Sequence, residues 1–229
     1  MTYYDKNLIV QFLDGNGDDI IKNGSRDLKA LLESESGPNI VPIVTVPFVA
    51  PRPFGLDRDK RAELAAALGD LSSDSRLYLR GHGDWERRTL GGWSAREVGG
   101  VLGGRLRISP KLISVTGCRC ARAVAPGAES NTTVSGAARV AANRLLLEES
   151  PSSFVGVLHF RLRRHGITSP MVGRVFFVTV IGAPENDAQL SVGQKITAIS
   201  GDERNHRPQS KIRFDWEGTT QTAAWVRYS

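Results

Sequence analysis

Two short apolar segments of this chain each end in a glycine that is followed by a chemically reactive side chain. Residues 77–81 lead to His82, and residues 112–117 lead to Cys118. In a parallel α/β sheet, the carboxyl ends of the strands open into the crevice where ligands bind. The two segments therefore predict strands that bring an imidazole and a thiol together at one edge of a sheet. This pair is the minimum equipment for nucleophilic catalysis by cysteine.

The segment between the two strands predicts a helical crossover. Ser94 and Glu97 have the S-x-x-E spacing of a capping box, which indicates a helix that starts near residue 94. Strand, helix and strand then form one right-handed βαβ unit. In this arrangement we expect the backbone amides of Gly83 and Cys118 to face a developing oxyanion.

Each of these residues also has a simpler interpretation. A single histidine at a strand end is more often a surface or packed residue, and a single cysteine is more often a small buried hydrophobe. The joint pattern favours catalysis. Cys118, directly after the glycine, is the predicted nucleophile, and Cys120 is predicted to be a packing residue.

The stretch from residue 77 to residue 118 resembles the clan CD cysteine peptidases. It most resembles the autoprocessing cysteine protease domains of MARTX toxins and large glucosylating toxins. In those domains a strand ends Gly-His-Gly, a segment of the type Leu-Ser-Gly-Tyr-Ser-Ala-Asp-Glu-Leu follows, and a strand Ile-Ser-Ile-Val-Gly-Cys delivers the nucleophile. Residues 90–98 and 113–118 are the counterparts here, residues 7–11 resemble the family's first strand, and residues 192–216 resemble its carboxyl-terminal β-flap.

The resemblance implies a caspase-like α/β fold: a mostly parallel central sheet with helices on both faces and a C-terminal β-flap hairpin. A length of 229 residues with 40% hydrophobic content suits one domain over residues 1–229. The expected helices and strands are, in chain order, strand 8–12, helix 20–32, strand 40–46, helix 58–68, strand 77–80, helix 94–102, strand 112–116, helices 135–149 and 152–165, strand 174–181, and a hairpin of 195–200 with 211–216. Pro42 indicates an irregular or edge position for strand 40–46. Segment 135–149 reads as an insertion relative to the toxin domains.

The resemblance also implies an activity. It implies a cysteine endopeptidase of a bacterial toxin or effector, in which Cys118 and His82 act as a dyad on a polypeptide substrate. Cleavage would occur in cis, as autoprocessing, or in trans, next to an apolar residue such as Leu. Asp84 lies two positions after His82, and Asp14 lies near the place where some members of the family carry an acid after their first strand; neither is assigned as an orienting acid.

The toxin domains are activated by inositol hexakisphosphate, which binds in a basic pocket beside the β-flap. The resemblance implies the same activator here. The matching cations are Arg76, Lys195 and Lys211, and Arg204 and Arg207 on the flap would add charge. A polyphosphate needs several Arg and Lys side chains that converge from separate segments.

Two other functions remain open from the sequence. One is a catalytically silent module of the same fold that senses inositol phosphate or binds a protein. The other is a basic nucleic-acid-binding domain, because the net charge is +6. No zinc-finger, RRM or helix-turn-helix signature accompanies that charge, so we expect no nucleic-acid partner.

Metal binding and membrane insertion are not expected. A Cys-x-Cys pair formed by Cys118 and Cys120 has no second ligand pair beside it, and two such close cysteines indicate a reducing compartment. No apolar run reaches the length of a membrane span, and no classical signal peptide is recognisable. Together with the resemblance, this predicts a protein that is secreted or delivered into the host-cell cytosol.

Overall fold

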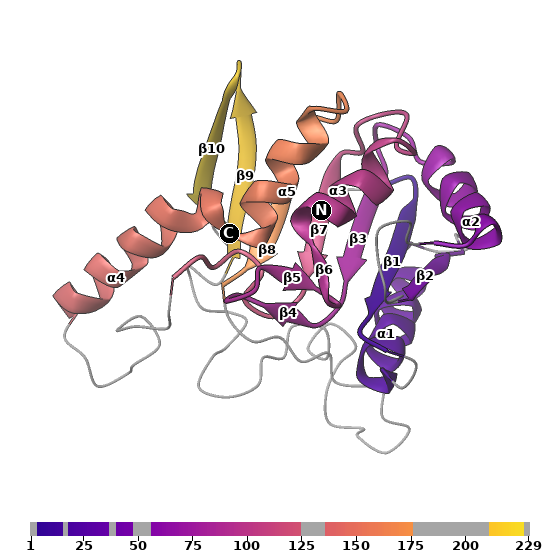
Figure 1. The fold of residues 1–229 in the computed structure, drawn as a ribbon, viewed down its shortest axis with the longest axis horizontal. Coiled ribbons are helices and arrows are strands. Elements are labelled where there is room, and N and C mark those ends of the chain that lie inside the picture. Colours follow the sequence, from indigo (N-terminus) through magenta and orange to yellow (C-terminus); the bar gives the residue numbers. More distant parts are fainter. Residues whose placement is uncertain are drawn as a thin grey trace.

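The computed structural model describes residues 4–15, 18–36, 40–47, 56–124, 136–175 and 211–226. Its centre is a seven-stranded sheet with the order β10-β9-β8-β7-β3-β1-β2 (Figure 1). Strands β2, β1, β3, β7 and β8 run parallel to one another, and β9 pairs antiparallel with both of its neighbours, β8 and β10. The prediction of an α/β fold with a mostly parallel sheet is confirmed.

The strands of this sheet are β1 (Asn7–Leu13), β2 (Ile43–Pro47), β3 (Arg76–Arg80), β7 (Leu112–Thr116), β8 (Met171–Arg174), β9 (Lys211–Glu217) and β10 (Thr220–Trp225). A second, small sheet consists of β4 (Gly83–Asp84), β5 (Thr89–Leu90) and β6 (Trp93–Ser94), which lie between β3 and the next helix. The helices are α1 (Asp19–Ser36), α2 (Arg58–Gly69), α3 (Ala95–Gly103), α4 (Gly136–Glu149), the 3-10 turn η2 (Ser150–Ser152) and α5 (Phe154–Arg163).

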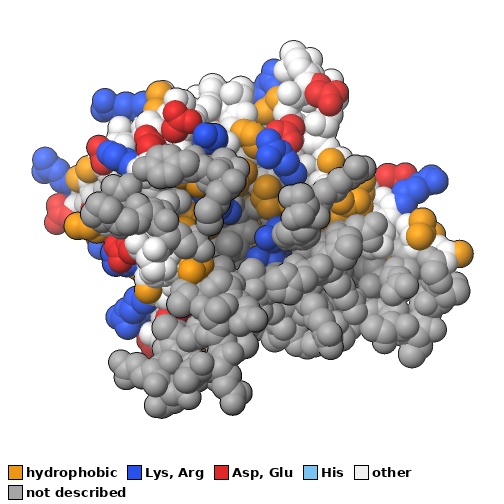
Figure 2. Space-filling model, turned by 180° about the vertical axis from the view of Figure 1, so that it is seen from behind, with side chains coloured by type: hydrophobic (Ala, Val, Ile, Leu, Met, Phe, Trp, Pro, Cys, Tyr) orange, Lys and Arg blue, Asp and Glu red, His pale blue; other side chains and the backbone are white. Residues whose placement is uncertain are grey.

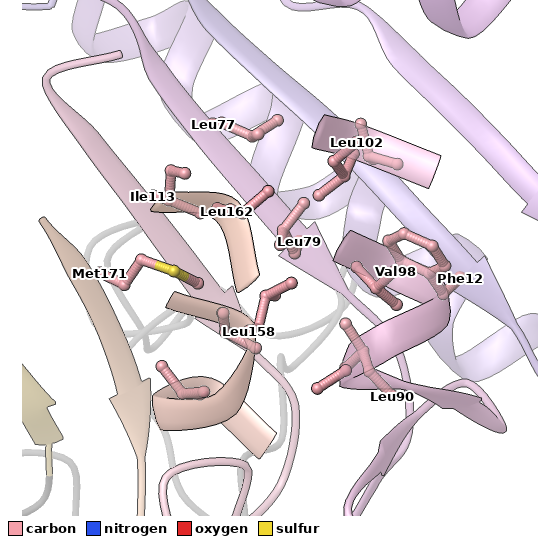
Figure 3. Close-up of a cluster of buried hydrophobic side chains, with 14 of the residues drawn as sticks. Phe12, Leu77, Leu79, Leu90, Val98, Leu102, Ile113, Leu158, Leu162 and Met171 are labelled. Atoms are coloured by element: carbon pink, nitrogen blue, oxygen red, sulfur yellow. The ribbon is translucent and has the colours of Figure 1, made fainter. Parts of the chain in front are cut away.

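The main core lies on one face of the sheet. Leu77 and Leu79 of β3 are both fully buried. They are two positions apart, so their side chains point to the same face of the sheet. They pack with Leu102 of α3 and Leu158 of α5, as Figure 3 shows. Complete burial of one such leucine contributes about 1.5–3 kcal/mol. This core fixes the level at which β3 and β7 end.

The other face of the sheet is covered by α1 over β1 and β3. Leu28 and Leu32 of α1 form a second buried cluster with Ile9 and Tyr78. Helices therefore cover both faces, as predicted from the sequence. Because α1 carries the chain from β1 to β2 and β3 lies on the opposite side of β1, the strand order reverses between β1 and β3. A reversal of this kind opens a crevice at the carboxyl ends of the two strands.

The βαβ unit predicted around the two reactive residues is present. β3 and β7 pair in parallel, and α3 begins with the predicted capping box of Ser94 and Glu97. β2 is an edge strand that starts directly after Pro42, in agreement with the edge position that this proline indicated.

The carboxyl-terminal strands differ from the prediction. β9 pairs with β8 on one side and with β10 on the other. The hairpin partner of residues 211–216 is therefore β10, and the prediction that residues 195–200 form this hairpin is wrong. A strand has only two edges, and residues 212–214 of β9 use both. The observed hairpin is β9–β10, and strand β10 was not predicted. Residues 195–200 and 176–181 lie outside the described residues, so only the start of the predicted strand 174–181, at the end of β8, is observed.

Segment 135–149 forms α4, as predicted, at the periphery of the molecule near β10 (Figure 1). Among the described residues, no helix has the length and apolar character needed to cross a bilayer.

Substitution of Gly83 tests how closely the segment after β3 packs against the end of β7. A Cβ placed on Gly83 would lie 1.9 Å from the carbonyl oxygen of Cys118. We expect Gly83→Ala to lower the free energy of unfolding by about 1–3 kcal/mol, because the backbone must move. Gly100→Ala is the matched control, since a Cβ there meets nothing within 4 Å and alanine favours the helix by up to about 1 kcal/mol. Equal unfolding midpoints in urea for Gly83→Ala and the parent chain would contradict this packing.

Candidate active site

The imidazole of His82 is held by a buried carboxylate. His82 Nε2 lies 3.0 Å from Oδ1 of Asp18. The Asp18 side chain is 4% exposed, whereas the His82 side chain is 46% exposed. A carboxylate in this position fixes the orientation of the imidazole. The imidazole is thus oriented from inside the protein and accessible from outside.

Asp18 occupies its position because it also caps α1. Its Oδ1 accepts a hydrogen bond from the backbone N–H of Ile21, and its Oδ2 accepts one from the backbone N–H of Asp14. An aspartate at the N-cap satisfies amides that the first helical turn leaves without partners. One carboxylate therefore joins the end of β1, the start of α1 and the end of β3.

His82 and Cys118 lie level with each other at the ends of neighbouring strands. Arg80 and Thr116 are the last residues of β3 and β7 that pair with each other. His82 follows Arg80 by two positions, and Cys118 follows Thr116 by two positions. Gly83 lies directly against the backbone of Cys118. The structure therefore brings the two predicted residues to one edge of the sheet, where Cys118 is partly exposed.

Glycines allow this close approach. A Cβ on Gly81 would lie 2.9 Å from the carbonyl oxygen of Phe12, and a Cβ on Gly117 would lie 2.6 Å from Cys120 Sγ. Gly81 directly precedes His82, and Gly117 directly precedes Cys118. At both positions a larger residue would clash with neighbouring atoms, which explains why glycine is found there. After the nucleophile, Arg119 has a φ of 53°, a left-handed conformation that is uncommon without glycine and is frequent at functional sites.

The segment that follows Cys118 is anchored to two other elements. The N–H of Ala121 donates to the carbonyl oxygen of Arg174 in β8, and the N–H of Val155 in α5 donates to the carbonyl oxygen of Cys120. Cys120 is 1% exposed and belongs to the main core. Burial, and then the nearby Cys118 and Asp84, raise the pKa of the Cys120 thiol well above its ordinary value. Cys120 is thus a packing residue, as predicted, and Cys118 is the accessible thiol.

A buried guanidinium lies behind the site. Arg80 in β3 is 3% exposed, and its Nε donates to Ser25 Oγ of α1. Burial lowers the pKa of Arg80 to about 10, and the negative charges of Asp27 and of ionised Cys118 partly oppose this shift. A cation close to a cysteine favours the thiolate, which is the nucleophilic form.

Sequence reasoning missed both Asp18 and Arg80. Asp18 carried one usable signal, since an aspartate directly before a helical segment is a candidate N-cap. Its contact with His82 spans 64 positions and depends on the tertiary fold. Asp18, and neither Asp14 nor Asp84 that the sequence analysis considered, is the described carboxylate that contacts His82. Asp84 instead accepts a hydrogen bond from the backbone N–H of Arg87.

A cavity of about 490 Å³ opens beside His82. It lies at the carboxyl ends of β1 and β3, at the point where the strand order reverses, and the small sheet forms one wall. Its described lining consists of Asp14, His82, Gly83, Asp84, Trp85, Arg87, Thr89, Gly92 and Arg119. No aliphatic side chain is among these described lining residues.

Three basic side chains gather beyond β3 on the face of the sheet that α1 covers over β1 and β3. We call Arg76, Arg174 and Lys211 the cationic cluster. The three come from β3, β8 and β9, and Arg174 and Lys211 are paired in register. Burial, followed by Arg174 and Arg76, lowers the pKa of Lys211 to about 7. Like charges held this closely favour the uptake of an anion.

The sequence had singled out two members of this cluster. Arg76 donates from Nε and Nη2 to Ser114 Oγ, at 3.1 and 2.9 Å, and its guanidinium lies over the ring of Tyr78. The structure thus brings Arg76 and Lys211 together and adds Arg174, which was not predicted. The other three predicted effector residues, Lys195, Arg204 and Arg207, lie outside the described residues.

Elsewhere on the described surface, charges of both signs are mixed. Figure 2 shows basic and acidic side chains interspersed on the side opposite to the view of Figure 1. A nucleic-acid-binding face is more typically a continuous basic stripe. Within the described residues, no group of three or more His, Cys, Asp or Glu side chains is placed to hold a metal ion.

Comparison with known proteins gives no match: neither a family model nor a curated protein matches this chain. The likeness to the toxin protease domains therefore rests on the sequence motifs alone: those around His82 and Cys118, residues 7–11 and residues 192–216.

The lowered pKa of Lys211 predicts how stability depends on pH. In the unfolded chain the lysine keeps its ordinary value of 10.5, whereas the folded value is about 7. Between these values the unfolded chain binds the additional proton, so the contribution of Lys211 to the free energy of unfolding rises with pH from about 7 to about 10.5.

Urea unfolding at pH 7 and pH 9 measures this effect. We expect the parent chain to gain more stability over that interval than Lys211→Met, which has no titrating group at this position. An equal change in both chains would contradict the burial of Lys211 beside two arginines.

Proposed function

We propose that this protein is a cysteine endopeptidase with Cys118 as nucleophile, His82 as general acid and base, and Asp18 as the residue that orients His82. The observation that carries the proposal is the buried Asp18 carboxylate, 3.0 Å from His82 Nε2, at the strand end adjacent to Cys118. A nucleophile, a base and a group that orients the base form the general arrangement of covalent hydrolysis.

The reaction runs through a thioester. The Cys118 sulfur attacks the peptide carbonyl carbon while its proton passes to His82 Nδ1, because Asp18 already holds Nε2. His82 then gives this proton to the leaving amine as the C–N bond breaks. Water attacks the thioester, loses a proton to His82 and expels Cys118, which recovers its proton from the imidazole.

The charge that develops on the carbonyl oxygen needs hydrogen-bond donors that are already in place. The backbone amides of Gly83 and Cys118 are our candidates, since these two residues are in contact at the ends of β3 and β7. Such donors act most strongly in a site that excludes water. The cation of Arg80, buried behind the site, adds a further preference for negative charge.

We further propose that inositol hexakisphosphate activates the enzyme by binding the cationic cluster. The support is electrostatic: Arg76, Arg174 and Lys211 converge from three strands, and burial, followed by repulsion from the two arginines, lowers the pKa of Lys211. A polyphosphate would relieve this repulsion through charge-assisted hydrogen bonds. Arg174 also interacts with Arg80, so charge neutralisation at the cluster would be felt near Cys118. Lys195, Arg204 and Arg207 remain candidates for the same ligand.

The alternative is a silent module of the same fold that senses inositol phosphate. The cationic cluster supports this reading equally, whereas the set of Cys118, His82 and Asp18 supports the enzyme. The resemblance to toxin domains supports a bacterial toxin or effector that acts on polypeptides in the host-cell cytosol, in cis or in trans.

Replacement of Asp18 tests the catalytic role separately from the structural one. Asparagine caps a helix as well as aspartate does, so we expect Asp18→Asn to change the free energy of unfolding by less than about 1 kcal/mol. It should lower the turnover number for peptide hydrolysis by about tenfold or more, because the imidazolium loses its counter-charge.

Asp19→Asn is the matched control, since Asp19 is the exposed neighbour on the same helix. It should keep full activity, and Cys118→Ala should abolish it. Full activity of Asp18→Asn would contradict the proposed role, and hydrolysis that persists in Cys118→Ala would end the assignment of the nucleophile.

Activation by the polyphosphate is tested by labelling Cys118 with an electrophilic peptide probe, followed by mass spectrometry. We expect inositol hexakisphosphate to increase the labelling rate. Lys211→Gln should require about tenfold more ligand, because one charge-assisted contact is lost. Arg58→Gln, an exposed cation on α2 that was not assigned to the effector site, should respond like the parent chain. A labelling rate that does not change with the ligand would contradict the proposed activation, and the proposed peptidase activity would still stand.

A further inference from the structure

The cavity beside His82 is placed to receive a substrate side chain. It shares His82 and Gly83 with the candidate catalytic site, and Arg119, directly after Cys118, lies on its wall. A volume of about 490 Å³ is within the usual range of ligand pockets, about 300–1,000 Å³. A residue adjacent to the scissile bond would therefore extend into this cavity.

The chemistry of the lining does not suit an aliphatic side chain. The one large apolar surface among the described lining residues is the ring of Trp85, and the rest is polar or charged. An apolar pocket for leucine would instead need several aliphatic or aromatic walls, because the gain on binding scales with the apolar area removed from water.

The charged side chains of the cavity lining differ in whether they have a described partner. Asp84 accepts from the backbone of Arg87, and its Oδ2 lies 3.7 Å from the Arg87 guanidinium. Arg119 also has interactions of its own. The carboxylate of Asp14, in contrast, has no side-chain interaction with any described residue, and its backbone N–H is held by Asp18. Asp14 is thus a lining carboxylate that no described side chain pairs with, and it lies next to Asp18, the carboxylate that orients His82.

Trp85 offers the second half of a recognition site for a cation. Its ring lines the cavity and makes no ring contact with the described residues. The face of a tryptophan attracts ammonium and guanidinium groups, and an added carboxylate strengthens this attraction through charge-assisted hydrogen bonds.

We infer that the cavity binds the cationic side chain of a lysine or arginine, so that the enzyme cleaves polypeptides next to a basic residue. This inference rests on the proposed peptidase activity and departs from the leucine that the resemblance implies. Asp14 would bind the charged end of the substrate side chain, and Trp85 would pack against its apolar stem. Asp14 and Trp85 would then be specificity residues, distinct from the set that performs the chemistry.

The test uses electrophilic peptide probes that differ only in the residue next to the reactive carbon: arginine, lysine, leucine or glutamate. The measurement is the rate at which each probe labels Cys118 in the full chain with inositol hexakisphosphate present. We expect arginine and lysine probes to react at least about tenfold faster than the leucine probe, since only the basic side chains can form both the charge-assisted contact with Asp14 and the cation–π contact with Trp85.

Two variants test whether this preference for basic probes arises in the cavity. Asp14→Asn should remove most of the advantage of the basic probes and leave the leucine probe unchanged, because the backbone N–H that contacts Asp18 is retained. Asp19→Asn, which lies outside the cavity lining, should keep the full preference.

The outcomes separate the inference from the proposed function. Fast labelling by the leucine probe, with no effect of Asp14→Asn, would overturn the inference and leave the peptidase standing. Labelling of Cys118 by iodoacetamide but by none of the four peptide probes would overturn both, because the thiol would be accessible and yet bind no substrate.

Discussion

The hydrogen bond between Asp18 and His82 is the interaction on which the candidate site depends. It joins the helix that follows the first strand to the end of the third strand, at the place where the order of the sheet reverses. The same carboxylate caps α1, so folding of that helix and orientation of the imidazole are linked. A reversal point is where open α/β sheets bind ligands. Here the Asp18–His82 pair and the cavity lie at the reversal, and Cys118 follows the neighbouring strand β7.

Close backbone packing supports this interaction. The ends of β3 and β7 approach until Gly83 contacts Cys118, which only a residue without a side chain allows. Behind them, the buried Arg80 guanidinium is close enough for attraction to a thiolate at Cys118 and for repulsion from Arg174 of the cationic cluster. Negative charge is therefore favoured in two places on one sheet, at the sulfur of Cys118 and over the cationic cluster, and Arg80 couples the two electrostatically.

Much of this could be predicted from the sequence, because local patterns carried it. Glycines before His82 and Cys118 predicted the two strand ends, and the capping box at Ser94 predicted the crossover helix. Asp18, Arg80 and Arg174 could not be placed in this way, since their roles arise from contacts between distant segments. Strand β10 was missed for a related reason: its sequence, Thr220–Trp225, is weakly apolar, and it is a strand because β9 offers it an edge.

A double-mutant cycle tests the central claim that Asp18 and His82 act on Cys118 as one unit. The measurement is the rate of Cys118 alkylation by the neutral reagent iodoacetamide in the parent chain, Asp18→Asn, His82→Ala and the double variant. If Asp18 acts through His82, its replacement slows alkylation in the parent chain and has no further effect once His82 is absent. Equal effects of Asp18→Asn with and without His82 would contradict the account.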